Sequence, residues 1–161
     1  MIKEEFLQLA TDAARTSSQT SGLPAGITLA QAILESAWGQ SELSRRANNY
    51  FGIKAHGKHP SVEFPTTEVR DGKLIRITAK FAAYDRIAQC FACRDRLISG
   101  GAVYAEARAS AQDPERFARA LAKHWATDPR YADKLLRIYH ENKLERLDAD
   151  ARRGDGEASG L

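Results

Sequence analysis

One stretch of the sequence constrains the fold more than any other: from Thr16 to Ser41, the only ionisable side chain is Glu35. The spacing within this stretch predicts a helix from Ala25 to Trp38, with Gly39 as its stop. This helix carries apolar groups on most of its sides, and a helix that is apolar nearly all round is a buried one. The remaining elements are therefore expected to pack around it.

A lone glutamate in such a helix needs an explanation, and a chemical role is one. An unpaired carboxylate in an apolar setting is costly, so the group holds its proton to higher pH. At 100° per residue, Thr28, Gln31 and Glu35 lie within about 60° of one another, on a narrow polar strip. A glutamic acid that is protonated near neutral pH is what a glycosidase needs to protonate the departing sugar oxygen. The alternative, a Glu35 that faces solvent or pairs with a distant arginine, stays open at this point.

Helical periodicity and loop signals divide most of the remaining chain. Asp113-Pro114 and Thr127-Asp128-Pro129 each have the sequence of a helix start, whereas the glycine pair at 100–101 ends a helix. The predicted segments are a helix at 3–16, a small-polar linker at 17–22, a loop at 46–54, a helix capped by Asp85 and ending at Ile98, and two helices that follow 113–114 and 127–129.

Between residues 62 and 83 the period changes to two, and Asp71-Gly72 lies at the centre as a strong hairpin turn. The alternation predicts a small antiparallel flap with one apolar face and one polar face. Glu63 and Glu68 are both assigned to the polar face. A glycosidase usually needs a second carboxylate across the bond, so both are candidates, although most hairpin glutamates are only solvated surface.

These elements predict an α+β fold, mainly α: a helical body with a small antiparallel β-hairpin lobe and a cleft between them. The 161 residues, 43% hydrophobic and 28% charged, suffice for one domain, which we place at residues 1–147. Residues 148–161 offer nothing to bury and are expected to form a flexible C-terminal tail.

Charge and hydropathy exclude several partners. The net charge of +3 comes from scattered basic residues without an aromatic-basic stripe, which argues against nucleic-acid binding. No run approaches the roughly 18 apolar residues of a membrane span, so stable membrane insertion is not expected. The N-terminal sequence MIKEEF has charges where a signal peptide carries its apolar core.

Cys90 and Cys93 form a lone Cys-Phe-Ala-Cys inside a predicted helix. One pair cannot make a four-ligand zinc site unless histidines join it, and the four histidines lack zinc-finger spacing. We therefore expect two semi-buried thiols, no metal and no cofactor.

Four ordered blocks of the sequence resemble a known family. They are SGLPAGITLAQAILESAWG at 21–39 with SEL at 41–43, ANNYFGIK at 47–54, PTTEV at 65–69 with FAAY at 81–84, and TDPRYADKL at 127–135. The chain resembles the bacterial β-N-acetylglucosaminidases of glycoside hydrolase family 73, which include the muramidase-like domain of flagellar rod proteins and several autolysins.

The resemblance implies a lysozyme-like fold and cleavage of the β-1,4 bond between N-acetylglucosamine and N-acetylmuramic acid in peptidoglycan. By position, Glu35 matches the general acid, Glu68 the second carboxylate and Tyr131 a tyrosine near the cleaved bond. The residues expected to bind substrate along the groove are Gln31, Trp38, Asn49, Tyr50 and Phe51.

The expected partner is therefore the glycan strand of peptidoglycan, bound by a monomer. Compared with its relatives, this chain is expected to be a single-domain phage or prophage endolysin, made in the cytoplasm and released to the wall by a holin-like or other export route. Two rivals stay open: a lytic transglycosylase or muramidase of the same fold, and a non-catalytic wall-binding module. Whether the anomeric configuration is retained or inverted also stays open.

Overall fold

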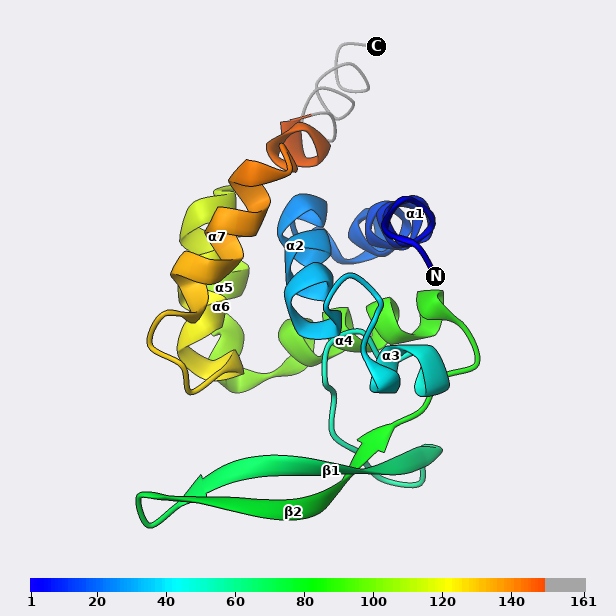
Figure 1. Ribbon diagram of the computed structural model, residues 1–161. Coiled ribbons are helices and arrows are strands. Elements are labelled where there is room, and N and C mark those ends of the chain that lie inside the picture. Colours follow the sequence, from blue (N-terminus) through cyan, green and yellow to red (C-terminus); the bar gives the residue numbers. More distant parts are fainter. Residues whose placement is uncertain (150–161) are drawn as a thin grey trace.

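Helices build most of the molecule, and a two-stranded hairpin lies against one side of them (Figure 1). The computed structural model describes residues 1–149. This arrangement confirms the predicted α+β, mainly α, fold. In chain order the elements are α1 (Lys3–Ser21), α2 (Ala25–Ser36), α3 (Glu42–Ala47), β1 (Ser61–Arg70), β2 (Lys73–Ala82), α4 (Ile87–Gly100), the 3-10 helix η1 (Ala102–Tyr104), α5 (Ala105–Ala109), α6 (Pro114–Trp125) and α7 (Tyr131–Glu141).

Helix α2 lies at the centre of the helical body, with α1 on one side and α6 and α7 on the other (Figure 1). Ten of its twelve residues are buried, as its all-round apolar sequence predicts. Gly26 permits a close approach to the C-terminal segment, because a Cβ there would lie 2.4 Å from the Leu144 carbonyl oxygen. The central helix is thus held from both ends of the chain.

The predicted end of α2 was wrong by two residues. The helix ends at Ser36, and Ala37, Trp38 and Gly39 follow with φ of 50°, 60° and 73°. A Cβ on Gly39 would lie 2.6 Å from the Phe6 ring, so the chain turns against α1 where only glycine fits.

The predicted linker at 17–22 was also wrong, because α1 continues to Ser21 and ends at Gly22. Its serines have low helix propensity, but tertiary bonds outweigh that preference. Ser17 and Ser21 donate to the Asp95 carboxylate on α4, and Ser18 donates to the Leu23 carbonyl.

The hairpin forms as predicted, with Asp71 and Gly72 at its turn and Glu68 directly opposite Ile75. The predicted faces were wrong. Residues opposite each other in an antiparallel pair share a face, so Glu68 lies on the apolar face, with Ile75 and Phe64. Glu63, five positions away, lies on the other face. The even positions of β1 are the less exposed ones, so Glu68 faces inward and Glu63 faces solvent.

Several helix boundaries differ from the prediction. Helix α4 begins at Ile87 with Arg86 rather than Asp85 at its N-cap, whereas Asp113 caps α6 as expected by accepting from the Arg116 N–H. The prediction missed α3, which begins at Glu42 and is capped by the Ser41 side chain, as well as η1 and α5.

The predicted start of the tail at Asp148 also needs revision. Asp148 is buried, and its carboxylate accepts hydrogen bonds from the Gly26 N–H and the Tyr139 hydroxyl. Residue 148 therefore belongs to the folded body. The remainder of the predicted tail, 150–161, lies outside the described residues.

Candidate active site

Glu35 lies in the last turn of α2, where three other segments meet it. Its Oε1 accepts a 2.7 Å hydrogen bond from the Tyr131 hydroxyl at the start of α7. The Trp125 side chain, at the end of α6, also hydrogen-bonds to the carboxyl group. On another side, Gly52 lies beside the second oxygen, because a Cβ on this glycine would lie 3.7 Å from Oε2.

Burial raises the pKa of Glu35 above the ordinary value of 4.5. The hydrogen bonds from Tyr131 and Trp125 act in the opposite direction but are smaller effects. The carboxyl therefore keeps its proton to higher pH than an exposed glutamate does, as the isolated position of Glu35 in the sequence predicted.

Tyr131 is buried and keeps its phenol hydrogen. Burial, and next the negative charge of Glu35, raise the pKa of its hydroxyl well above the usual range. The hydroxyl donates to Glu35 and accepts a 3.1 Å bond from Gln31 Nε2. The structure thus brings together Glu35 and Tyr131, two of the three predicted catalytic residues.

Gln31 lies behind Tyr131 and is fully buried. Its Oε1 accepts a 2.9 Å bond from Nε of Arg94 on α4, which is itself fully buried. The Gln31 side chain therefore contacts Tyr131 and Arg94, and it has no exposed surface for contact with a sugar. Arg94 was not predicted as a site residue, although a signal existed: Ile87, Phe91 and Ile98 define the inner face of α4, and helical spacing places Arg94 on that same face.

The Asn49 side chain stabilises its own loop through hydrogen bonds. Its amide nitrogen donates to the carbonyls of Ile53 and Ala82, and its oxygen accepts from the N–H groups of Phe51 and Ile53. Four bonds use the full capacity of an amide, so this side chain has none left for a sugar. The predicted role of Asn49 in substrate binding is therefore replaced by a structural one.

Tyr50 and Phe51 are core residues as well. Tyr50 is 4% exposed and Phe51 1% exposed, and both rings pack near Phe91 of α4. Trp38 is less buried and lies beside α1, where the Lys3 ammonium is 4.8 Å from its ring centroid. Of the five residues predicted to bind substrate, Trp38 alone keeps appreciable exposure.

Glu68 has a different environment from Glu35. It forms ion pairs of 3.6 Å with Lys54 and with Arg70, and its side chain is 36% exposed. Within residues 1–149, no hydrogen bond or ion pair joins it to Glu35. It therefore lies in a basic setting on the inner face of the hairpin and is available as a second carboxylate.

Both thiols are buried and free. Burial raises the pKa of Cys90 to about 12, so it stays protonated and is no nucleophile. Cys93 Sγ lies 3.7 Å from His56 Nε2. No group of three or more potential metal-ligating side chains is found among the described residues.

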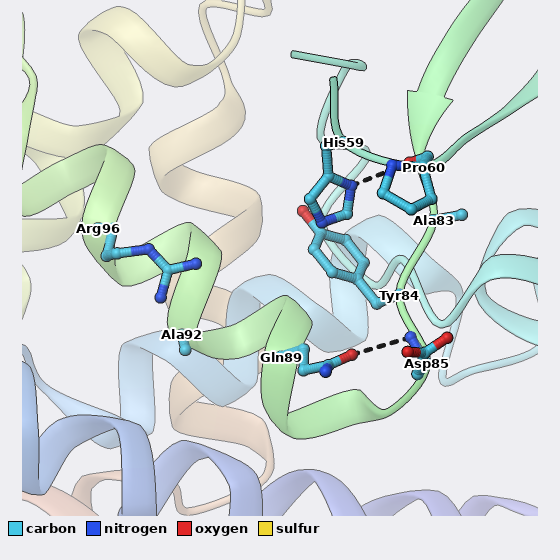
Figure 2. A pocket seen from close by; sticks show the side chains of 8 residues that line it. All are labelled: His59, Pro60, Ala83, Tyr84, Asp85, Gln89, Ala92 and Arg96. Carbon is cyan, nitrogen blue, oxygen red and sulfur yellow. Dashed lines mark hydrogen bonds between the residues drawn. The ribbon is translucent and has the colours of Figure 1, made fainter. Parts of the chain in front are cut away.

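A pocket of about 310 Å³ lies where the hairpin meets α4 (Figure 2). Figure 2 shows His59 beside the Tyr84 ring, and Gln89 accepting a 2.9 Å hydrogen bond from the Asp85 N–H. Neither Glu35 nor Glu68 lines this pocket. The titrating carboxyl and the phenol bonded to it therefore mark the candidate active site, and the pocket does not.

Residues 11–144 match the model of the glucosaminidase family, described as mannosyl-glycoprotein endo-beta-N-acetylglucosaminidase. The chain belongs to this family. Solved structures agree: the catalytic domain of the autolysin Auto from Listeria monocytogenes superposes with a TM-score of 0.82 at 29% identity, covering 90% of this chain and 86% of that one. A peptidoglycan hydrolase mutant from Sphingomonas sp. A1 gives 0.76 at 34%, covering 89% and 96%. The predicted resemblance and the lysozyme-like fold are thereby confirmed.

Curated members of the family are longer than this chain. The peptidoglycan hydrolase FlgJ of Escherichia coli K12 is 37% identical over 145 residues, which are 86% of this chain and 46% of that protein. The exo-glucosaminidase LytG of Bacillus subtilis is 39% identical over 127 residues, 76% and 45% respectively. The chain thus spans about half the length of these relatives. Within residues 1–149, none of the helices is long and apolar enough to cross a membrane.

Proposed function

We propose that this protein is a peptidoglycan hydrolase that cleaves the β-1,4 bond between N-acetylglucosamine and N-acetylmuramic acid, with Glu35 as general acid. One observation carries the proposal: a half-buried glutamic acid with a raised pKa and a neutral tyrosine bonded to one of its oxygens. An acid of this kind delivers its proton to the glycosidic oxygen as the bond from that oxygen to the sugar breaks. The names of the relatives, peptidoglycan hydrolase and exo-glucosaminidase, support the substrate class.

In this proposal Glu68 is the second carboxylate. Its place on the inner face of β1 and its partial exposure suit a group that stabilises positive charge on the sugar or activates water. Tyr131 lies at the cleaved bond, where its neutral hydroxyl orients Glu35 and the substrate.

The hairpin supplies a matched pair for testing that role. Glu68→Gln is expected to lower kcat on purified sacculi by about tenfold or more, whereas Glu63→Gln keeps kcat within about twofold. The reason is that Glu68 lies on the inner face and Glu63 on the outer face of the same strand. Turnover of both variants on one batch of sacculi is the measurement, and equal losses would contradict the assignment.

The bond that is cut has a chemical signature. We expect digestion of sacculi, followed by borohydride reduction and mass spectrometry, to give reduced N-acetylglucosamine at the new ends. Reduced N-acetylmuramic acid would instead identify a muramidase, and 1,6-anhydro ends a lytic transglycosylase.

Two observations favour a lytic transglycosylase or a muramidase as the second candidate function. A transglycosylase needs a single acid/base, and no second carboxylate bonds to Glu35 in the described chain. A Lactococcus lactis relative, 34% identical over 164 residues, is a probable N-acetylmuramidase. The monomeric state and the origin in a phage or prophage stay predictions, which light scattering and genomic context test.

A further inference from the structure

The hydrogen bonds behind Glu35 have a fixed direction. Arg94 can only donate, so the Gln31 amide must turn its oxygen toward Arg94 Nε, at 2.9 Å. The amide nitrogen then faces the Tyr131 oxygen at 3.1 Å and donates to it. Since the phenol oxygen accepts there, its own hydrogen points to Glu35 Oε1, 2.7 Å away. Three consecutive bonds thus run in one direction, from Arg94 to the carboxyl.

The start of this chain of bonds is anchored in the core. Arg94 is fully buried, and its Nη1 donates at 2.8 Å to both Thr28 Oγ1 and Asp95 Oδ1. Asp95 in turn accepts from serines of α1, including Ser21 at 2.8 Å. The guanidinium carbon of Arg94 lies 5.6 Å from the Phe51 ring centroid. The guanidinium therefore has contacts on α2, α4 and the loop after α3, and cannot reorient without breaking several of them.

We infer that Gln31, held by Arg94, is a positioning residue that keeps the phenol hydrogen of Tyr131 on Glu35 Oε1 and thereby leaves the acidic proton on Oε2. This inference rests on the proposed role of Glu35 as general acid. Oε2 is the oxygen beside Gly52, and it takes no part in the Tyr131 hydrogen bond. A proton on Oε2 is free to transfer to a glycosidic oxygen, whereas a proton on Oε1 would be held against the phenol.

Without the Gln31 N–H, nothing determines the direction of the last bond. Tyr131 can then turn its hydroxyl hydrogen away and accept a hydrogen bond from a protonated Glu35 instead. The acidic proton in that arrangement lies on Oε1, toward the protein interior. Such molecules have a protonated but unproductive acid.

The same change alters the titration of Glu35 in a predictable direction. The groups that bond to Glu35 are Tyr131 of α7 and Trp125 of α6, and both lower its pKa. The nearest charged groups along the network are Arg94 and Asp95 of α4, beyond Gln31. Weakening the Tyr131 bond removes a stabilisation of the carboxylate, so the pKa of Glu35 rises further.

Two substitutions of Gln31 test the inference through the pH profile of kcat. Gln31→Glu keeps the shape and the contact with Arg94 but loses the N–H, and Gln31→Met removes both polar atoms. For both we expect the kcat plateau to fall about tenfold or more. The alkaline limb, where loss of the Glu35 proton ends activity, is expected to move to higher pH. A residue with only a structural role would lower the plateau and leave that limb in place.

Thr28→Val is the matched control, because it removes another bond of Arg94 in the same buried network but leaves the path from Gln31 to Glu35 intact. Its alkaline limb should coincide with that of the wild type. An unshifted limb in both Gln31 variants, or an equal shift in Thr28→Val, would overturn the positioning role. Retained activity in Glu35→Gln would instead overturn the proposed function, so the two failures are distinguishable.

Discussion

Glu35→Gln is expected to lower kcat on purified sacculi by about 10²- to 10⁴-fold. The amide keeps the shape of the side chain and can still accept the Tyr131 hydrogen bond at its oxygen. It cannot release a proton to the glycosidic oxygen, which is the step that the raised pKa of Glu35 serves. Turbidity loss and muropeptide release, measured at several pH values, give the effect.

Stability provides the control for this variant. Because burial raises the pKa of Glu35, the folded state binds more protons than the unfolded state between pH 4.5 and the raised value. The free energy of unfolding of the wild type therefore falls as pH rises through that window, and the Gln variant lacks this fall. Activity within tenfold of the wild type in a well-folded Glu35→Gln would remove Glu35 from the role of acid.

Arg94→Met is expected to destabilise the fold strongly. Arg94 is fully buried and its Nη1 lies 2.8 Å from the Asp95 carboxylate, which is also buried. Removing one partner leaves an uncompensated charge inside, which costs about 3–5 kcal/mol. For a domain of this size the melting temperature should fall by roughly 6–20 °C, since each kcal/mol is worth about 2–4 °C.

A surface pair gives the comparison for that loss. Arg119 and Asp133 lie 3.5 Å apart with both side chains exposed, so Arg119→Met should change stability by less than about 1 kcal/mol. The double variant Arg94→Met/Asp95→Leu removes both buried charges and should recover part of the stability. Thermal unfolding of all three at one pH is the measurement. Similar melting temperatures for Arg94→Met and Arg119→Met would contradict the buried-charge argument.

Local patterns in the sequence were sufficient for the main elements of the fold. The burial of α2 follows from its all-round apolar composition, and the hairpin turn follows from Asp71-Gly72. The length of α1 does not follow, because its last turn depends on bonds from Ser17 and Ser21 to Asp95, 78 and 74 positions away. Helix propensity depends on local sequence and takes no account of partners so distant in the chain.

Some features of the candidate site could likewise be predicted from the sequence, and others could not. The isolated position of Glu35 among apolar residues predicted a raised pKa, and the family resemblance identified Tyr131. The side chains of Asn49 and Phe51 were assigned to substrate because a polar or aromatic residue in a loop looks the same whether it faces a groove or a core. The faces of Glu63 and Glu68, by contrast, could have been predicted from their odd separation alone.

The contact between Gly26 and Asp148 bears on the order in which the chain becomes ordered during synthesis. Pro24 at the N-cap of α2 supplies no side-chain acceptor, and the carboxylate that accepts from the Gly26 N–H comes from 122 positions later. A negative group at a helix N-terminus satisfies a free N–H and interacts favourably with the positive end of the helix dipole. Until Asp148 has been synthesised, the first turn of the helix that carries Glu35 lacks this acceptor. The central helix is therefore synthesised before the residue that completes its first turn.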